Sequence, residues 1–189
     1  MKLESQQYLL KLARQTLEHY FQTGKKLVVD DAKLDKELKE PRGTFVTLHT
    51  KTGELRGCIG HIEPMQAVYL DVIDNALSAG LEDSRFSPLQ EAELADLNID
   101  ISILTIPYRL KYSMVKKLLA SLRPNIDGVI IKKGAKSATY LPQVWEDITN
   151  KEEFLTSLCL KAGLRPDEWK TGEVKVYLYQ AEVFHEHKT

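Results

Sequence analysis

"GTFVTLHTKTGELRGCIGHI", residues 43–62, is the stretch that decides the fold of this chain. It contains two β-rich runs, residues 43–50 and 53–62, with a short connection that contains glycine between them. A connection of that kind is typical of a β-hairpin. We therefore expect the two runs to be neighbouring antiparallel strands.

Outside the hairpin, apolar residues repeat at steps of three and four, which predicts helices, or alternate with polar residues, which predicts strands. The expected helices cover residues 5–24, 65–81, 115–122 and 151–163. The expected strands cover residues 98–105, two runs within 127–142 around a turn at 134–137, and one final strand at 174–184. These elements lack the regular strand-helix-strand order of a doubly wound sheet. The sequence therefore predicts an α+β fold, with a mostly antiparallel sheet flanked by helices.

The length and composition suit an ordinary globular protein. With 189 residues, of which 43% are hydrophobic, the chain can build one substantial core or two small cores that share an interface. No linker-like segment divides it. We expect a single domain over residues 1–189, and we expect any two lobes within it to be interleaved and discontinuous in sequence.

The charge balance argues against a general affinity for polyanions, because 26 Lys and Arg stand against 27 Asp and Glu. No run approaches the roughly 20 apolar residues of a membrane-spanning helix, and the first 15 residues lack the apolar stretch of a signal peptide. The two cysteines, Cys58 and Cys159, are too few for the disulfide framework of a small secreted protein. We therefore expect a cytoplasmic protein with reduced thiols and no membrane contact.

The second strand of the hairpin carries the first candidate site. Side chains alternate across a strand, so Arg56 and Cys58 share one face, on a surface that Gly57 and Gly60 would leave bare. A neighbouring cation favours the thiolate form of a cysteine, which is the nucleophilic form. In the alternative interpretation, Cys58 is a small buried hydrophobe and Arg56 is bound to a carboxylate.

His61 lies three residues after Cys58. The two could supply two ligands to a metal, but a closed zinc site needs four and no second pair is present, so we expect no metal site. His49 or His61 could act as a base for Cys58, although no third residue that would orient the base is evident. The sequence also lacks the glycine-rich motifs of nucleotide sites, and it leaves the cofactor unknown.

Two further segments carry polar or aromatic side chains of interest. In "EDSRF", Asp83, Arg85 and Phe86 follow a predicted helix, where they could either serve a binding function or hold a turn. Aromatic and basic residues also alternate in residues 107–117, "PYRLKYSMVKK". A short basic stretch is more often a solvated surface, so nucleic acid is a minor alternative there.

Taken together, these motifs resemble the AMMECR domain family. The resemblance runs from about residue 9 to the final strand, and its segments keep the family's order. The combination of LRGCIG with a following DxRFxPL is the most specific part. At Gly80 and Leu81 this chain departs from the alanine and phenylalanine of the family pattern. The matching segments are "PRGTFVTL", "GELRGCIGHIEP", "EDSRFSPL", "IDISILTIP", "DGVII", "TYLPQVWED" and "FLTSLCLKAGL", with Trp169 shortly after.

The resemblance implies an α+β module with two closely associated lobes and with the LRGCIG segment at the groove between them. It also implies that prokaryotic members act with Memo-like proteins and radical S-adenosylmethionine proteins, without implying an established reaction. The site residues carried over by motif are Arg56, Gly57, Cys58, Gly60, Asp83, Arg85 and Phe86.

Three functions are therefore considered. The first is a binding module for a partner protein, a peptide or a small anionic ligand, with Arg56 and Arg85 as charged anchors. The second is a thiol-dependent enzyme, or a component of a modification complex, that uses Cys58. The third is RNA binding through residues 108–117. The sequence favours the first two, because it lacks both a complete catalytic constellation and a strongly basic composition.

Overall fold

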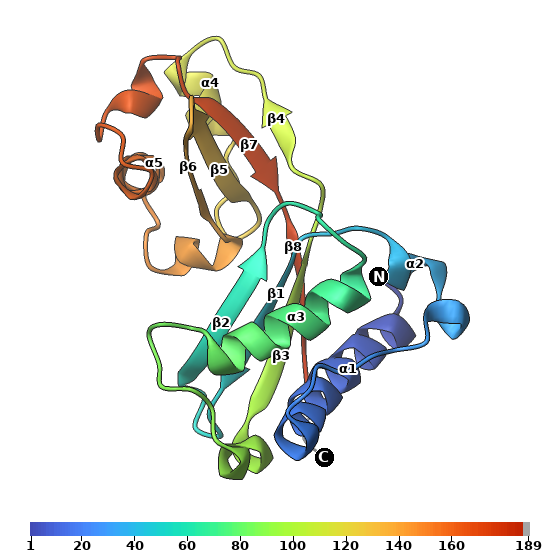
Figure 1. Ribbon diagram of the computed structural model, residues 1–189. Helices are drawn as coiled ribbons and strands as arrows, with labels where there is room; N and C mark the ends of the chain where they lie inside the picture. The colour runs from blue at the N-terminus through green and yellow to red at the C-terminus, as the bar shows by residue number, and fades with distance from the viewer. Residues whose placement is uncertain (187–189) are drawn as a thin grey trace. The chain divides into compact units, whose positions relative to one another are not determined.

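The computed structural model describes residues 1–186 and contains two compact units. Unit 1 consists of Met1–Leu104 and the returning segment that starts at Glu182, and unit 2 consists of Thr105–Ala181. Each unit has its own four-stranded sheet and its own hydrophobic core (Figure 1).

Unit 1 is built on a sheet with the strand order β2-β1-β3-β8. The hairpin expected from residues 43–62 is confirmed, because β1 and β2 pair in antiparallel fashion, and β1 also pairs antiparallel with β3. These strands are β1 (Thr44–His49), β2 (Leu55–His61), β3 (Asn98–Leu104) and β8 (Ala181–His185).

Helices α1 (Leu3–Thr23) and α3 (Val68–Leu81) cover one face of this sheet (Figure 1). Alternate strand residues such as Val46, Ile59 and Ile101 face these helices and join their core. The intervening residues therefore project from the opposite face. The minor helices of unit 1 are η1 (Asp31–Lys33), α2 (Lys36–Lys39) and η2 (Glu91–Asp96).

Unit 2 has a sheet with the order β4-β7-β5-β6, packed on one face against helices. Trp145 and Phe154 stack in its core with their ring centroids 3.6 Å apart. On the other face, the ring of Tyr179 lies over Gly128, and its hydroxyl donates to the carbonyl of Tyr140 at 3.1 Å. The strands are β4 (Tyr108–Leu110), β5 (Gly128–Lys133), β6 (Lys136–Tyr140) and β7 (Lys175–Tyr179), and the helices are α4 (Val115–Ser121), η3 (Pro142–Glu146), α5 (Lys151–Lys161) and η4 (Glu168–Lys170).

The α+β class is confirmed, and the prediction for the last strand is wrong. The single strand expected at residues 174–184 is two strands, β7 and β8, which belong to different sheets. They separate at Gln180, whose backbone N–H donates to Thr105 Oγ1 at 2.8 Å and whose carbonyl accepts from the Thr105 N–H at 2.9 Å. Alternation of side chains reports which face a residue occupies, and it does not report which sheet the strand joins.

No helix within residues 1–186 is both long enough and apolar enough to cross a bilayer.

Candidate functional site

The two glycines of LRGCIG lie where neighbouring groups leave no room for a side chain. A Cβ atom on Gly57 would stand 2.1 Å from the carbonyl oxygen of Ala79, so α3 can approach β2 only at a glycine. A Cβ atom on Gly60 would stand 2.3 Å from the ring of Phe45, its partner on β1. The expectation that the glycines leave a bare surface is therefore wrong, because a helix backbone and an aromatic ring fill those spaces.

Arg56 is bound to a carboxylate, as the alternative interpretation predicted. Its Nε donates to Glu93 Oε1 at 2.7 Å and its Nη2 donates to Glu93 Oε2 at 3.0 Å. These hydrogen bonds lower the pKa of Glu93, and only 12% of the Arg56 side chain is exposed. The charge of Arg56 is thus compensated within unit 1, and the residue acts in holding the η2 segment against β2.

Cys58 is half-buried and projects from the sheet face that α1 and α3 leave uncovered. Its Sγ lies 3.1 Å from the Oγ1 of Thr47, which stands directly opposite on β1. Cys159, in contrast, is fully buried, and burial raises the pKa of its thiol. The description of a small buried hydrophobe therefore fits Cys159 rather than Cys58.

Asp83 and Arg85 bind the backbone of Cys58 from the outer side of β2, which is an edge strand of its sheet. Asp83 Oδ2 accepts from the Cys58 N–H at 2.9 Å, and Arg85 Nη2 donates to the Cys58 carbonyl at 3.2 Å. The two side chains thus take the place of a neighbouring strand at this residue. This contact joins the LRGCIG and DxRFxPL segments in the fold.

The Asp83–Arg85 ion pair is itself strongly hydrogen-bonded. Asp83 Oδ1 accepts from Arg85 Nε at 2.9 Å, and Asp83 Oδ2 accepts from Arg85 Nη2 at 2.7 Å. These bonds hold the pKa of Asp83 well below its usual range and raise the pKa of Arg85. Asp83 is therefore a buried carboxylate that stays ionised at neutral pH.

Arg85 is fixed in position and yet open to solvent. Its side chain is 55% exposed, whereas that of Asp83 is only 4% exposed. The guanidinium lies 5.5 Å from the centroid of the half-buried Phe86 ring, and its Nη1 has no hydrogen-bond acceptor within residues 1–186. A guanidinium in this setting can donate to a carboxylate or phosphate oxygen of a ligand.

The predicted pairing of Cys58 with a histidine does not form in the described residues. His61 projects toward α3, on the opposite face of β2 from Cys58, and its Nδ1 lies 2.9 Å from the buried Asp71 Oδ1. His49 shares the face of Cys58, but its Nε2 lies 3.2 Å from Asp100 Oδ2. The thiol therefore hydrogen-bonds to a hydroxyl, and no base is bound to it within residues 1–186.

Several polar residues of this face were not predicted as part of the site. Asp100 pairs with Thr47 in register, and it contacts His49 and His185, with its Oδ1 2.9 Å from His185 Nδ1. Thr47 and Asp100 each lie between buried residues of their strands, so alternation of side chains is the signal that could have found them. The pairing register that places them side by side has no signal in the sequence.

Within residues 1–186 no cluster of three or more His, Cys, Asp or Glu side chains is arranged to hold a metal ion.

The sequence and the fold resemble those of archaeal proteins. Protein MK0488 of Methanopyrus kandleri is 37% identical over 193 residues, which cover 98% of this chain and 90% of that protein. Protein MJ0810 of Methanocaldococcus jannaschii is 38% identical over 192 residues, with coverage of 98% and 92%. The crystal structure of the uncharacterized protein PH0010 from Pyrococcus horikoshii superposes with a TM-score of 0.88 at 35% identity, and the match covers 99% of this chain and 94% of that chain.

The AMMECR1 family model matches residues 10–184, which include both LRGCIG and the Asp83–Arg85 segment that binds it. The predicted resemblance is thus confirmed over nearly the whole chain, and this protein belongs to the AMMECR1 family.

Proposed function

We propose that this protein is a ligand- or partner-binding module whose contact surface in unit 1 consists of β2 and the Asp83–Phe86 loop. The observation that carries the proposal is the state of Arg85. Two hydrogen bonds to Asp83 and one to the Cys58 carbonyl fix its guanidinium, which is nevertheless 55% exposed. A cation held in one orientation loses little conformational entropy when it binds an anion.

Binding is favoured over catalysis by the partners of the other charged and reactive groups. Glu93 compensates Arg56, and the Cys58 thiol contacts a hydroxyl rather than a base. His61 is bound to Asp71 on the other face of β2. A nucleophile at neutral pH needs an adjacent base or a lowered pKa, and in the part of the chain that the structure describes no base is bound to Cys58.

The favoured occupant is a carboxylate-bearing peptide segment of a partner or a small anionic ligand. Arg85 would donate from Nη1 to the anion, while Phe86 would contact an apolar group beside it. The family resemblance implies Memo-like proteins and radical S-adenosylmethionine proteins as partners. The free thiols of Cys58 and Cys159 suit a cytoplasmic setting, in which cysteines stay reduced.

The experiment that tests this proposal compares Arg85→Gln with Arg165→Gln. Arg165 is a matched control, because it is also largely exposed and also donates to a buried carboxylate, that of Glu168, at 3.0 Å. Calorimetry would measure binding of purified Memo-like and radical S-adenosylmethionine proteins from the same organism. We expect Arg85→Gln to weaken binding by about tenfold or more, the effect of losing one charge-assisted hydrogen bond, while Arg165→Gln changes it by less than about twofold.

Equal affinities of the two variants would overturn the assignment of Arg85 as an anchor. Thermal unfolding of both variants serves as the control for folding, since each loses one ion pair to a buried acid.

Thiol chemistry at Cys58 is a second candidate function. One observation favours it: the half-buried Sγ lies on the uncovered sheet face with Thr47 as its hydrogen-bond partner. Complementation of a deletion strain by Cys58→Ser and Cys58→Ala would test the idea. Loss of complementation by both variants, with partner affinity unchanged, would support a reacting thiol, and full complementation by Cys58→Ser would exclude it.

A further inference from the structure

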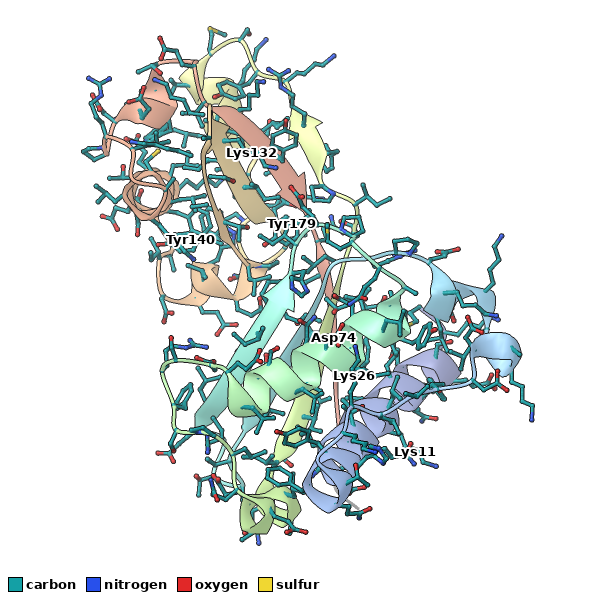
Figure 2. The ribbon with its side chains drawn as sticks, viewed as in Figure 1. Lys11, Lys26, Asp74, Lys132, Tyr140 and Tyr179 are labelled. Carbon is teal, nitrogen blue, oxygen red and sulfur yellow. The ribbon has the colours of Figure 1, made fainter. Side chains whose placement is uncertain are left out.

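The sheet of unit 2 carries a row of cations across neighbouring strands. Lys132 on β5 pairs directly with Lys175 on β7, so two lysines stand opposite each other (Figure 2 labels Lys132). Lys175 also lines a pocket of about 220 Å³ together with Arg109 and Lys111 from the β4 side.

Arg109 differs from every other arginine of the chain. The chain has seven arginines, and Arg109 is the one that has no acidic partner within residues 1–186, a property that Lys111 and Lys175 share. Glu173, which precedes the pocket residue Val174, is bound to Lys133 instead. The six paired arginines are Arg14 with Glu186, Arg42 with Glu40, Arg56 with Glu93, Arg85 with Asp83, Arg123 with Asp127 and Arg165 with Glu168.

An aromatic ring lies among these cations. Tyr177 stands opposite Arg109 in the β4–β7 register and two residues from Lys175 on the same strand face. The Nζ of Lys132 lies 5.8 Å from the centroid of the Tyr177 ring. The surface therefore combines positive charge with an aromatic side chain, which is the combination that binds single-stranded nucleic acids.

We propose that this basic face, defined by Arg109, Lys111, Lys175 and Tyr177, binds the phosphate groups of nucleotides, and that single-stranded RNA is its favoured ligand. Phosphates would pair with Arg109, Lys111 and Lys175, which have no acidic partner within residues 1–186, and Tyr177 offers a ring for a base to stack on. The net charge of −1 gives the whole protein no such attraction, so the affinity resides in this face. The proposal concerns unit 2 and stands apart from the Arg85 surface of unit 1.

The first measurement is the affinity of the full-length protein for a fluorescent oligouridylate of about 12 nucleotides, which exceeds the smallest known single-strand sites. If the face neutralises three to four phosphates of a single strand, the affinity should fall by about 20-fold to 50-fold between about 50 and 200 mM salt. Absence of binding at the lower salt, for both the oligonucleotide and pyrophosphate, would overturn the proposal.

The variant test compares two double substitutions that remove the same charge. Arg109→Gln with Lys175→Gln alters the basic face, whereas Lys116→Gln with Lys117→Gln alters α4, which packs on the other face of the sheet through Leu118. We expect the first pair to weaken binding by about 20-fold or more and the second pair by less than about threefold. Similar losses in both pairs would show that the attraction is not specific to this face and would overturn the proposal.

Two further measurements identify the ligand. If a base stacks on the Tyr177 ring, Tyr177→Leu should weaken oligouridylate binding by about 5-fold to 150-fold, and Tyr177→Phe should bind as tightly as the wild type. Pyrophosphate competition distinguishes the sources of phosphate. If pyrophosphate binds with the same sensitivity to Arg109→Gln and Lys175→Gln while the oligonucleotide does not bind, the phosphate site stands and its ligand is a small phosphorylated molecule.

Discussion

Gly57 lies where α3 comes closest to β2, and its missing side chain sets that distance. The contact is with the Ala79 carbonyl, part of a helix backbone that cannot move without its neighbours. Gly80, one residue further along α3, is in a different situation. A Cβ atom there would meet the flexible end of Leu17 at 3.3 Å. Alanine substitutions at Gly57 and at Gly80 can therefore be compared to test which of the two glycines the packing requires.

We expect Gly57→Ala to lower the free energy of unfolding by about 3 kcal/mol or more, at the upper end of overpacking effects, because backbone blocks the new methyl group. Gly80→Ala is expected to change stability by less than about 1 kcal/mol, since the gain in helix propensity offsets a small shift of Leu17. Urea unfolding of both variants measures the difference. Equal effects would mean that β2 and α3 separate easily at Gly57.

Arg56 and Cys58 show which properties of a single residue could be predicted from the sequence. Strand alternation correctly placed Cys58 on the face opposite the core residue Ile59, whereas Arg56 lies where the β1–β2 register shifts. It did not reveal that Glu93, from a short helix more than 30 positions later in sequence, neutralises the guanidinium. Partners that arrive through tertiary contact leave no local signal, so the charge state around a thiol could not be predicted from spacing.

At the scale of elements, β2 is an edge strand whose exposed backbone is bound by side chains. Asp83 accepts from the Cys58 N–H, and Arg85 donates to its carbonyl. An open strand edge can pair with another chain, and this contact prevents such pairing at Cys58. The loop after α3 thus stabilises the β1–β2 hairpin.

Asp83→Asn is expected to reduce the free energy of unfolding by about 1 to 3 kcal/mol, because a buried acceptor of charge-assisted hydrogen bonds loses its charge while Arg85 remains partly solvated. Asp96→Asn is the control, since Asp96 is 64% exposed and forms only a surface ion pair with Lys51. Its effect is expected to stay below about 0.5 kcal/mol. Urea unfolding at neutral pH measures both.

The same carboxylate predicts a dependence on pH. Hydrogen bonds from Arg85 and from the Cys58 N–H keep the folded-state pKa of Asp83 below its unfolded value. Its contribution is therefore complete above about pH 4, the unfolded-state pKa, and is lost as the pH falls further toward the folded-state pKa. The stability gap between the wild type and Asp83→Asn should narrow below about pH 4, and a gap that widens there would contradict this origin.

Element prediction succeeded where periodicity is strong and failed at crossings between sheets. The helices near residues 3–23 and 68–81 and the hairpin strands were predicted within a few residues. Gln180 was missed because its neighbours keep alternating through the point where β7 ends and β8 begins. Strand β4 has only three residues, too few for alternation to be recognised. The family resemblance located the two motifs, but the contact between them required coordinates.

At the scale of the whole molecule, unit 2 is an insertion between β3 and β8 of unit 1. The two core clusters share no residue, so each unit buries its own apolar side chains. The connecting residues Thr105 and Gln180 are hydrogen-bonded to each other. The ends of the insertion are thus close in space, as is typical of an inserted domain.

This arrangement predicts that each unit folds by itself. Replacement of Thr105–Ala181 by a linker of about three residues should leave a unit 1 that unfolds cooperatively, because the hydrogen-bonded ends need little span. The isolated fragment Thr105–Ala181 should do the same. Circular dichroism and amide proton dispersion measure both, and disordered spectra for both fragments would show that neither core is sufficient alone.

The insertion also sets an order of events on the ribosome. Strand β3 emerges early, yet its neighbour β8 is among the last segments to be synthesised. Strand β7, which completes the sheet of unit 2, ends at Tyr179, and β8 begins at Ala181, so a chain that ends between them has a complete unit 2 sheet while β3 still has an unpaired edge. A translation arrest shortly before residue 181 would therefore release a chain whose middle is folded and whose beginning is exposed to chaperones and proteases.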